Sequence, residues 1–170
     1  MLLEIGIIDR TGRFVEVEVL KDKLPDAVIS RLIEVNGQPA FCLTENKDQK
    51  VILTQEDIRQ TQLAKAAIRA GITLLQKKIR LSDMDIEKVL LAGAFGNYIR
   101  AESAIAIGLL PGIPAERIIF VGNAACSGAQ MLLLSEKARA KAKILAEKIE
   151  YIEIANQKDF TDVYAESMMF

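Results

Sequence analysis

Histidine and tryptophan are absent from the 170 residues of this chain, and cysteine occurs only twice. Without histidine the chain cannot form a Ser-His-Asp triad, a histidine metal site or an imidazole acid–base pair. Cys42 and Cys126 are far apart and belong to no CxxC pair, so the sequence indicates no zinc site, iron–sulfur cluster or disulfide scaffold. This use of cysteine favours a reducing, cytoplasmic location.

Excess charge and a membrane-spanning run are also missing. Lys plus Arg number 22 and Asp plus Glu 23, for a net charge of -1, so no global basic field would attract nucleic acid or an anionic membrane. The uncharged stretch 118–135 contains a Gly122-Asn123 break and further polar residues, which lipid could not satisfy. We therefore expect neither a nucleic-acid partner nor a membrane.

The apolar residues, 51% of the chain, are ample for a folded core. No repeat, low-complexity tract or linker divides the chain, so we expect a single unit over residues 1–170. Within it, residues 1–31 look like the remnant of a preceding element, and residues 32–53 indicate a hairpin and one further strand. The Asn36-Gly37 pair between two apolar runs is typical of a tight hairpin turn.

A long helix is predicted from Thr54 to about Lys78, because Thr54 and Asp57 have the spacing of a capping box. One stripe of this helix is apolar, and we expect it to be buried. It consists of Ala64, Ile68, Ile72, Leu75 and Ile79. Another stripe, with Gln62, Lys65 and Arg69, is expected to face solvent or a ligand. The small residues beside it, Gly71 among them, indicate a close approach by another backbone or a ligand.

Two short apolar runs, 89–92 and 118–121, predict buried strands, and each is followed by a glycine turn and a helix. Further along, we expect a charged helix from Ser135 to about Glu150, a last strand at 151–154, and a short helix before the C-terminus. Strands that alternate with helices predict an α/β fold, in which ligands bind at the carboxyl ends of the strands.

The glycine turns are the candidate ligand site. Without a Cβ, glycine lets backbone N–H groups approach a phosphate or a ribose closely. Gly93-Ala94-Phe95-Gly96 follows the first strand, and Gly122-Asn123 follows the second. If the two strands are neighbours, both turns lie at one edge of the sheet. Tight turns packed under helices have the same composition, so both interpretations stay open.

Five motifs resemble the C-terminal region of the reductive activators of corrinoid proteins. They are Thr54–Gln60, Gln62–Gly71, Leu91–Tyr98, Ile107–Pro111 and Val121–Ala125. Their order and spacing are similar to those of the family across most of residues 50–170. The resemblance implies the ribonuclease H-like, actin-like ATPase fold of the sugar kinase, chaperone and actin superfamily, with a mixed sheet flanked by helices.

In that family, ATP helps to deliver low-potential electrons to an inactive cob(II)amide methyl carrier, and full-length relatives place a plant-type ferredoxin domain upstream. The resemblance implies a corrinoid protein as partner, ATP or ADP as cofactor, and an iron–sulfur cluster only upstream of this region. Residues 54–170 would form the helix and nucleoside-binding region. The candidate nucleotide-binding residues are Gly93, Ala94, Phe95, Gly96, Asn97, Gln62, Lys65, Arg69, Gly122 and Asn123.

The sequence also departs from the family pattern. The two phosphate-binding motifs of the family, turns of the Asp-Ile-Gly-Thr type, have no match here, and neither do the ferredoxin cysteines. The chain therefore looks like the second lobe of an actin-like ATPase domain that carries only the nucleoside side of the site. We expect weak or absent ATP and ADP binding, no catalytic residue, no resident metal and no hydrolysis by this chain alone.

Two other functions stay open: a dimerisation and partner-docking module without nucleotide, and half of another ATP user, such as a 2-hydroxyacyl-CoA dehydratase activator or a small-molecule kinase. We also predict a homodimer. The apolar segment 2–8 and the tail 168–170 are expected to be exposed, and exposed apolar patches seek a partner surface.

Overall fold

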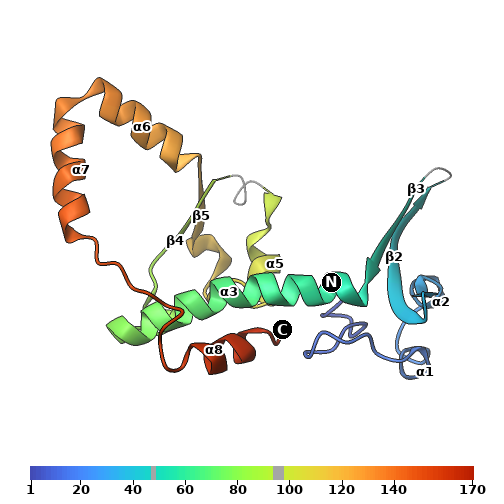
Figure 1. The fold of residues 1–170 in the computed structure, drawn as a ribbon. Coiled ribbons are helices and arrows are strands. Elements are labelled where there is room, and N and C mark those ends of the chain that lie inside the picture. Colours follow the sequence, from blue (N-terminus) through green and yellow to red (C-terminus); the bar gives the residue numbers. More distant parts are fainter. Residues whose placement is uncertain (47–48, 94–97) are drawn as a thin grey trace.

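A computed structural model of the protein describes residues 1–46, 49–93 and 98–170. The long helix α3 (Gln55–Ile79) crosses the middle of the molecule. The N-terminal segment and a β-hairpin lie at its first end, and α8 (Phe160–Ser167) runs alongside it (Figure 1). Within the described ranges, no helix is both long and apolar enough to cross a membrane.

The N-terminal part contains the predicted hairpin. It comprises α1 (Val17–Leu20), α2 (Asp26–Ile29), β1 (Leu32–Val35), β2 (Gln38–Asn46) and β3 (Gln49–Thr54). The three strands form an antiparallel sheet in the order β1-β2-β3. Asn36 and Gly37 both have positive φ, 53° and 76°, as a two-residue turn requires.

The apolar segment 2–8 is less exposed than the sequence suggested. Ile7 and Ile8 are buried with Leu20, Phe41 and Ile58, and the ring of Phe170 packs against the same cluster. The backbone N–H of Phe170 also donates to the carbonyl oxygen of Arg10, at 2.9 Å. The predicted exposure of the N-terminal segment and of the tail is therefore largely wrong, because the two segments cover each other within one chain.

Helix α3 begins and ends where the sequence predicts, but its buried side is the opposite of the predicted one. Thr54 and Asp57 form the capping box. Ile68, Leu75 and Ile79 of the apolar stripe are exposed, Ile79 at 61%. The buried side instead faces α8, where Ala66 and Ala70 let the second helix approach closely.

A second sheet holds the two predicted strands β4 (Val89–Ala92) and β5 (Ile118–Gly122), which pair in parallel. One face packs on a core that includes Ala104 of α5 (Ala101–Ala106), Leu109 of the loop after it and Ile118 at the start of β5, which follows the 3-10 turn η2 (Ala115–Arg117). The other face is open, and Leu90 is 61% exposed. Burial on both faces, expected from the apolar runs, is thus wrong, since the described residues place a layer on one face only.

Helices α6 (Ala124–Leu134) and α7 (Glu136–Lys148) extend away from the rest of the molecule (Figure 1). The charged, solvated helix predicted after Ser135 is confirmed, and the Ser135 side chain caps it. The strand expected at 151–154 is wrong: Ile154 packs against α3 instead. Its Cδ1 lies 3.6 Å from where a Cβ at Gly71 would be, so the described neighbour of Gly71 is a side chain at ordinary contact distance, not the backbone or ligand that we expected there.

The α/β class is confirmed. The described strands lie in two sheets, one antiparallel and one parallel, with helices packed beside both. The 3-10 turn η1 (Asp83–Asp85) connects α3 to β4, and Ser82 and Asp85 form a second capping box there.

Candidate functional site

The two glycine turns meet at one edge of the β4–β5 sheet, as predicted. The backbone N–H of Gly93 donates to the carbonyl oxygen of Gly122 at 2.7 Å. Both glycines have positive φ, 83° and 65°, which other residues adopt only with strain. Among the described residues, which do not include 94–97, a Cβ built at either position would meet no atom within 4 Å. No described residue therefore covers the backbone of these two glycines.

Around these turns, the remaining candidates are unevenly placed. Ala94, Phe95, Gly96 and Asn97 lie outside the described residues. Asn123 caps α6: its Oδ1 accepts a hydrogen bond from the backbone N–H of Cys126 at 3.0 Å. The carbonyl end of the Asn123 side chain is thus engaged in the helix cap, which leaves its NH2 group as the end available to a ligand.

Gln62 is buried, not solvated, with an exposed fraction of 2%. Its Nε2 donates to the carbonyl oxygens of Thr11 at 3.0 Å and Met168 at 2.9 Å. The side chain therefore ties the N-terminal segment and the C-terminal tail to α3.

Lys65 is also buried, with 3% exposed. Its Nζ donates to the carbonyl oxygen of Met169 and lies 5.0 Å from the centre of the Phe170 ring. Burial, with a smaller contribution from the charge of Arg69, lowers the pKa of Lys65 to about 8. Both effects oppose the charged form of the amine.

Arg69 pairs with Asp83 of η1. Its Nη2 lies 3.1 and 3.0 Å from the two carboxylate oxygens of Asp83. Asp83 also accepts from Gln76 Nε2 at 3.0 Å and from the backbone N–H of Gly112 at 2.8 Å. Although burial acts in the opposite direction, these hydrogen bonds and the charge of Arg69 lower the pKa of Asp83 below its usual value.

Sequence reasoning missed Asp83. It lies between Ser82 and Asp85, which form the capping box of η1, and nothing in the local pattern marks a partner that lies 14 residues earlier on α3. The other unforeseen partners of the polar stripe are backbone carbonyls at Thr11, Met168 and Met169. Backbone groups carry no residue-type signal. The described hydrogen bonds of Gln62, Lys65 and Arg69 reach the tail, the N-terminal segment and η1 rather than the glycine turns.

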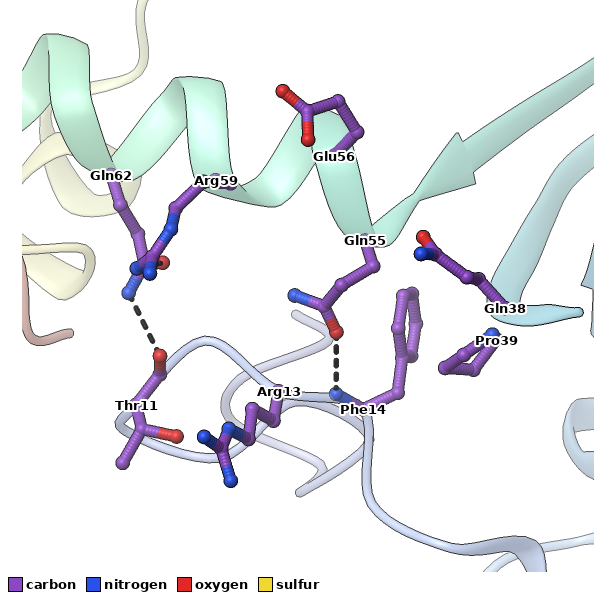
Figure 2. Close-up of a pocket in the computed structure, with 9 residues that line it drawn as sticks. All are labelled: Thr11, Arg13, Phe14, Gln38, Pro39, Gln55, Glu56, Arg59 and Gln62. Carbon is purple, nitrogen blue, oxygen red and sulfur yellow. Dashed lines mark hydrogen bonds between the residues drawn. The ribbon is translucent and has the colours of Figure 1, made fainter.

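A separate cavity of about 500 Å³ lies between the N-terminal segment and the first turns of α3 (Figure 2). Gln55 closes one side: its Oε1 accepts from the N–H of Phe14 at 3.3 Å and its Nε2 donates to the carbonyl oxygen of Gly12 at 2.6 Å. Arg13, Arg59 and Glu56 also line the cavity. Because charges of both signs line it, the cavity selects no single ligand chemistry.

The described residues contain no cluster of three or more His, Cys, Asp or Glu side chains that could hold a metal ion. Both cysteines are free. Free thiols in proteins usually pack in the interior as small apolar groups. Cys42 is buried in this way, whereas Cys126 on α6 is exposed.

Comparison with protein families gives a match over the whole chain. The family model described as the C-terminal domain of RACo, the ASKHA domain, matches residues 1–170. Among solved structures, a reductive activator for corrinoid, iron-sulfur protein is similar, with a TM-score of 0.80 and 33% identity. The match covers 99% of this chain and 26% of that one.

Two curated proteins are also similar. The corrinoid activation enzyme RamQ of Eubacterium limosum is 37% identical over 175 residues, which cover 100% of this chain and 29% of that protein. The [Co(II) methylated amine-specific corrinoid protein] reductase of Methanosarcina barkeri is 32% identical over 115 residues, which cover 66% of this chain and 21% of that protein. The chain thus spans less than a third of the length of either relative.

Proposed function

This chain belongs to the family described as the C-terminal, ASKHA domain of RACo, and from that membership we propose that it is the nucleoside-binding portion of an ATP-dependent reductive activator of corrinoid proteins. The observation that carries the proposal is the pair of open glycine turns at one sheet edge, in a chain that the family model matches throughout. Electron transfer, the iron–sulfur cluster and the corrinoid partner belong to the proposed longer protein.

The turn geometry supports a nucleoside more than a triphosphate. The bond between Gly93 and Gly122 fixes the two turns side by side, and the absence of a Cβ leaves room for a ribose or base against the backbone. The NH2 group of Asn123 supplies a donor at the same edge. The sequence offers no phosphate-binding Asp-Ile-Gly-Thr-type turn, so the expected activity of this chain is weak adenosine or ADP binding without hydrolysis.

Calorimetric titration with ADP and with adenosine tests this proposal, in the parent chain and in Gly93→Ala. The new methyl group projects into the open space in front of the turn, so binding should weaken at least about tenfold, or about 1.4 kcal/mol. Gly6→Ala is the matched control, because Gly6 has a similar φ of 75° and equally open surroundings. It shares the backbone strain and should leave affinity unchanged.

A docking module is the second candidate, and it is favoured by the apolar side chains that the described part of the chain leaves exposed. They include Leu90, Phe120, Leu133 and Leu134, on β4, β5 and α6. If neither ADP nor adenosine binds at millimolar concentration, the docking function replaces the nucleoside function. The family match favours a corrinoid activator over a 2-hydroxyacyl-CoA dehydratase activator or a small-molecule kinase.

We further propose a homodimer and a cytoplasmic location for the longer protein. The exposed apolar side chains of β5 and α6 supply a surface that a second copy would cover, although Ile7 and Ile8 no longer contribute to it. The free, exposed thiol of Cys126 suits a reducing compartment. Sedimentation over a concentration series tests the dimer, and a monomer at every concentration would contradict it.

A further inference from the structure

Among the described residues, Lys65 forms no ion pair with a carboxylate. Asp83 is paired with Arg69 and accepts two further hydrogen bonds, so its charge is already compensated. The hydrogen bond of Lys65 goes to a neutral carbonyl group, and Arg69, whose charge also lowers the pKa of Lys65, is a cation as well. Buried charges in proteins are normally paired, which makes this amine an exception that needs a partner.

Arg69 adds a second unsatisfied donor. Its Nη1 is buried and has no hydrogen-bond partner in the part of the chain that the structure describes. A buried guanidinium nitrogen without an acceptor costs the full desolvation penalty, which is larger for a charged group than for a neutral one. An acceptor supplied from outside the chain would remove that cost.

Both cations line the same cavity of about 330 Å³, between α3, the end of α5 and α8. Thr73 and Ser167 add hydroxyl groups to its lining, and within the described ranges neither hydroxyl has a protein partner. A Cβ at Gly108 would come within 3.4 Å of Lys65 Nζ, so the glycine leaves that side of the amine free of a side chain. Glu166, which is exposed, is the one carboxylate among the described residues that line the cavity.

We infer that this cavity binds a small oxyanion of the phosphate class, held by the Lys65 ammonium group, the Arg69 guanidinium group and the hydroxyls of Thr73 and Ser167. Ammonium and guanidinium groups are the usual ligands of such anions. The oxyanion is either a phosphate of a bound nucleotide or a free inorganic anion. The inference does not depend on the proposed nucleoside site.

Sulfate is the probe, because its charge stays constant across the pH range of interest. Equilibrium dialysis with radiolabelled sulfate at constant ionic strength should show one site per chain. Lys65→Met and Arg69→Gln should each lower the affinity at least about tenfold, which corresponds to about 1.4 kcal/mol. Lys77→Met is the matched control: it removes a cation of the same helix that pairs with Asp159 at the surface, and it should change the affinity by less than about twofold.

The pH dependence on the unaltered chain gives a test that needs no variant. Sulfate affinity should fall as the pH rises above about 8, where Lys65 loses its proton. The other charged groups at the cavity are Arg69, Glu166 and the partner carboxylate Asp83, and the pKa of Asp83 is lowered, away from this range. Absence of saturable sulfate binding, equal affinity in all three variants, or affinity that does not change with pH would each overturn the inference.

Competition separates the two sources of the anion. If the cavity holds a nucleotide phosphate, ADP displaces sulfate and adenosine does not. If it holds a free oxyanion, neither displaces sulfate. Sulfate binding is measured without nucleotide, so the two proposals can fail separately. A failure of ADP to bind at the Gly93 turn would reject the proposed function and leave the oxyanion site standing. A failure of sulfate to bind would reject the oxyanion site and leave the proposed function standing.

Discussion

Gly12 is the residue at which backbone conformation and side-chain packing constrain the fold together. Its φ is 80°, and a Cβ there would lie 2.5 to 2.6 Å from the side-chain amide of Gln62. Gly12→Ala therefore has two costs: backbone strain of about 1–2 kcal/mol, and displacement of a buried amide whose hydrogen bonds to Thr11 and Met168 would be lost, about 1–3 kcal/mol more. Urea unfolding should show a loss of about 2–5 kcal/mol in total.

Gly6→Ala separates the two costs. Gly6 has a φ of 75°, and a Cβ there would meet no atom within 4 Å, so only the strain of about 1–2 kcal/mol applies. Equal losses in the two variants would show that the Gln62 side chain moves aside without cost, and that it does not tie the two ends of the chain.

The buried amine of Lys65 should make stability rise with pH in the alkaline range. Its pKa is about 8 in the folded protein and about 10.4 in an unfolded chain. Between these values the unfolded state holds more protons on Lys65 than the folded state, so the free energy of unfolding increases with pH. In Lys65→Met this increase should be missing.

Chemical unfolding of the parent and of Lys65→Met at pH about 7.5 and about 10 measures the effect. Subtracting the free energy of unfolding of Lys65→Met from that of the parent at each pH cancels the titration of all other groups. Lys77→Met, with its amine at the surface, should keep the rise. The quantity to follow is the free energy of unfolding of the parent minus that of Lys65→Met. If it falls between pH about 7.5 and about 10, the folded protein stabilises the amine in its charged form, and the argument from burial fails.

Among the elements, α3 has the clearest start signal, and the signal has a measurable value. Thr54 Oγ1 accepts from the backbone N–H of Asp57 at 3.2 Å, and Asp57 Oδ2 accepts from the N–H of Thr54 at 2.8 Å. Thr54→Ala should cost about 1 kcal/mol of stability, as measured by urea unfolding. Thr61→Ala is the control, since its hydroxyl bonds the carbonyl oxygen of Asp57 within the same helix; an equal loss there would contradict a specific role of the cap.

The same helix shows what local sequence patterns predict and what they do not. The start of α3 follows from Thr54 and Asp57, because caps act through neighbours in the sequence. The buried side depends instead on partners that lie far along the chain, such as the Met168 and Met169 carbonyls. Gln62 and Lys65 are buried because those backbone acceptors satisfy them, and a hydrophobicity pattern does not register backbone acceptors.

Strands β4 and β5 show the same division for the candidate site. Apolar runs followed by glycines predicted the strands, their adjacency and the meeting of Gly93 with Gly122. The runs also predicted two covered faces, whereas Leu90 and Phe120 are exposed in the structure. Apolar runs are typical of strands covered on both faces, but they do not identify the segment that would cover each face.

At the scale of the molecule, the two ends of the chain are held together on α3. Phe170 packs into the cluster that contains Ile7 and Ile8, and its N–H donates to the carbonyl oxygen of Arg10. Met168 and Met169 engage Gln62 and Lys65 through their carbonyl groups. The last three residues therefore stabilise the N-terminal segment although the two segments are far apart in the sequence.

Truncation after Ser167 should consequently loosen the N-terminal segment before the rest of the molecule. Amide hydrogen exchange should accelerate at Asp9 and Val15, whose N–H groups donate to the carbonyl oxygens of Arg13 and Ile7, because their protection depends on the closed cluster. Amides of α5 and β4 belong to a different core and serve as the internal control.

If truncation unfolds the whole chain, Phe170→Ala removes only the ring and tests the same link. Unchanged exchange at Asp9 and Val15 in both variants would contradict this link. The N-terminal segment would then be held by Phe41 and Ile58 alone. The contacts of the tail with α3 would serve another role, and the structure offers one, the binding of an anion at Lys65.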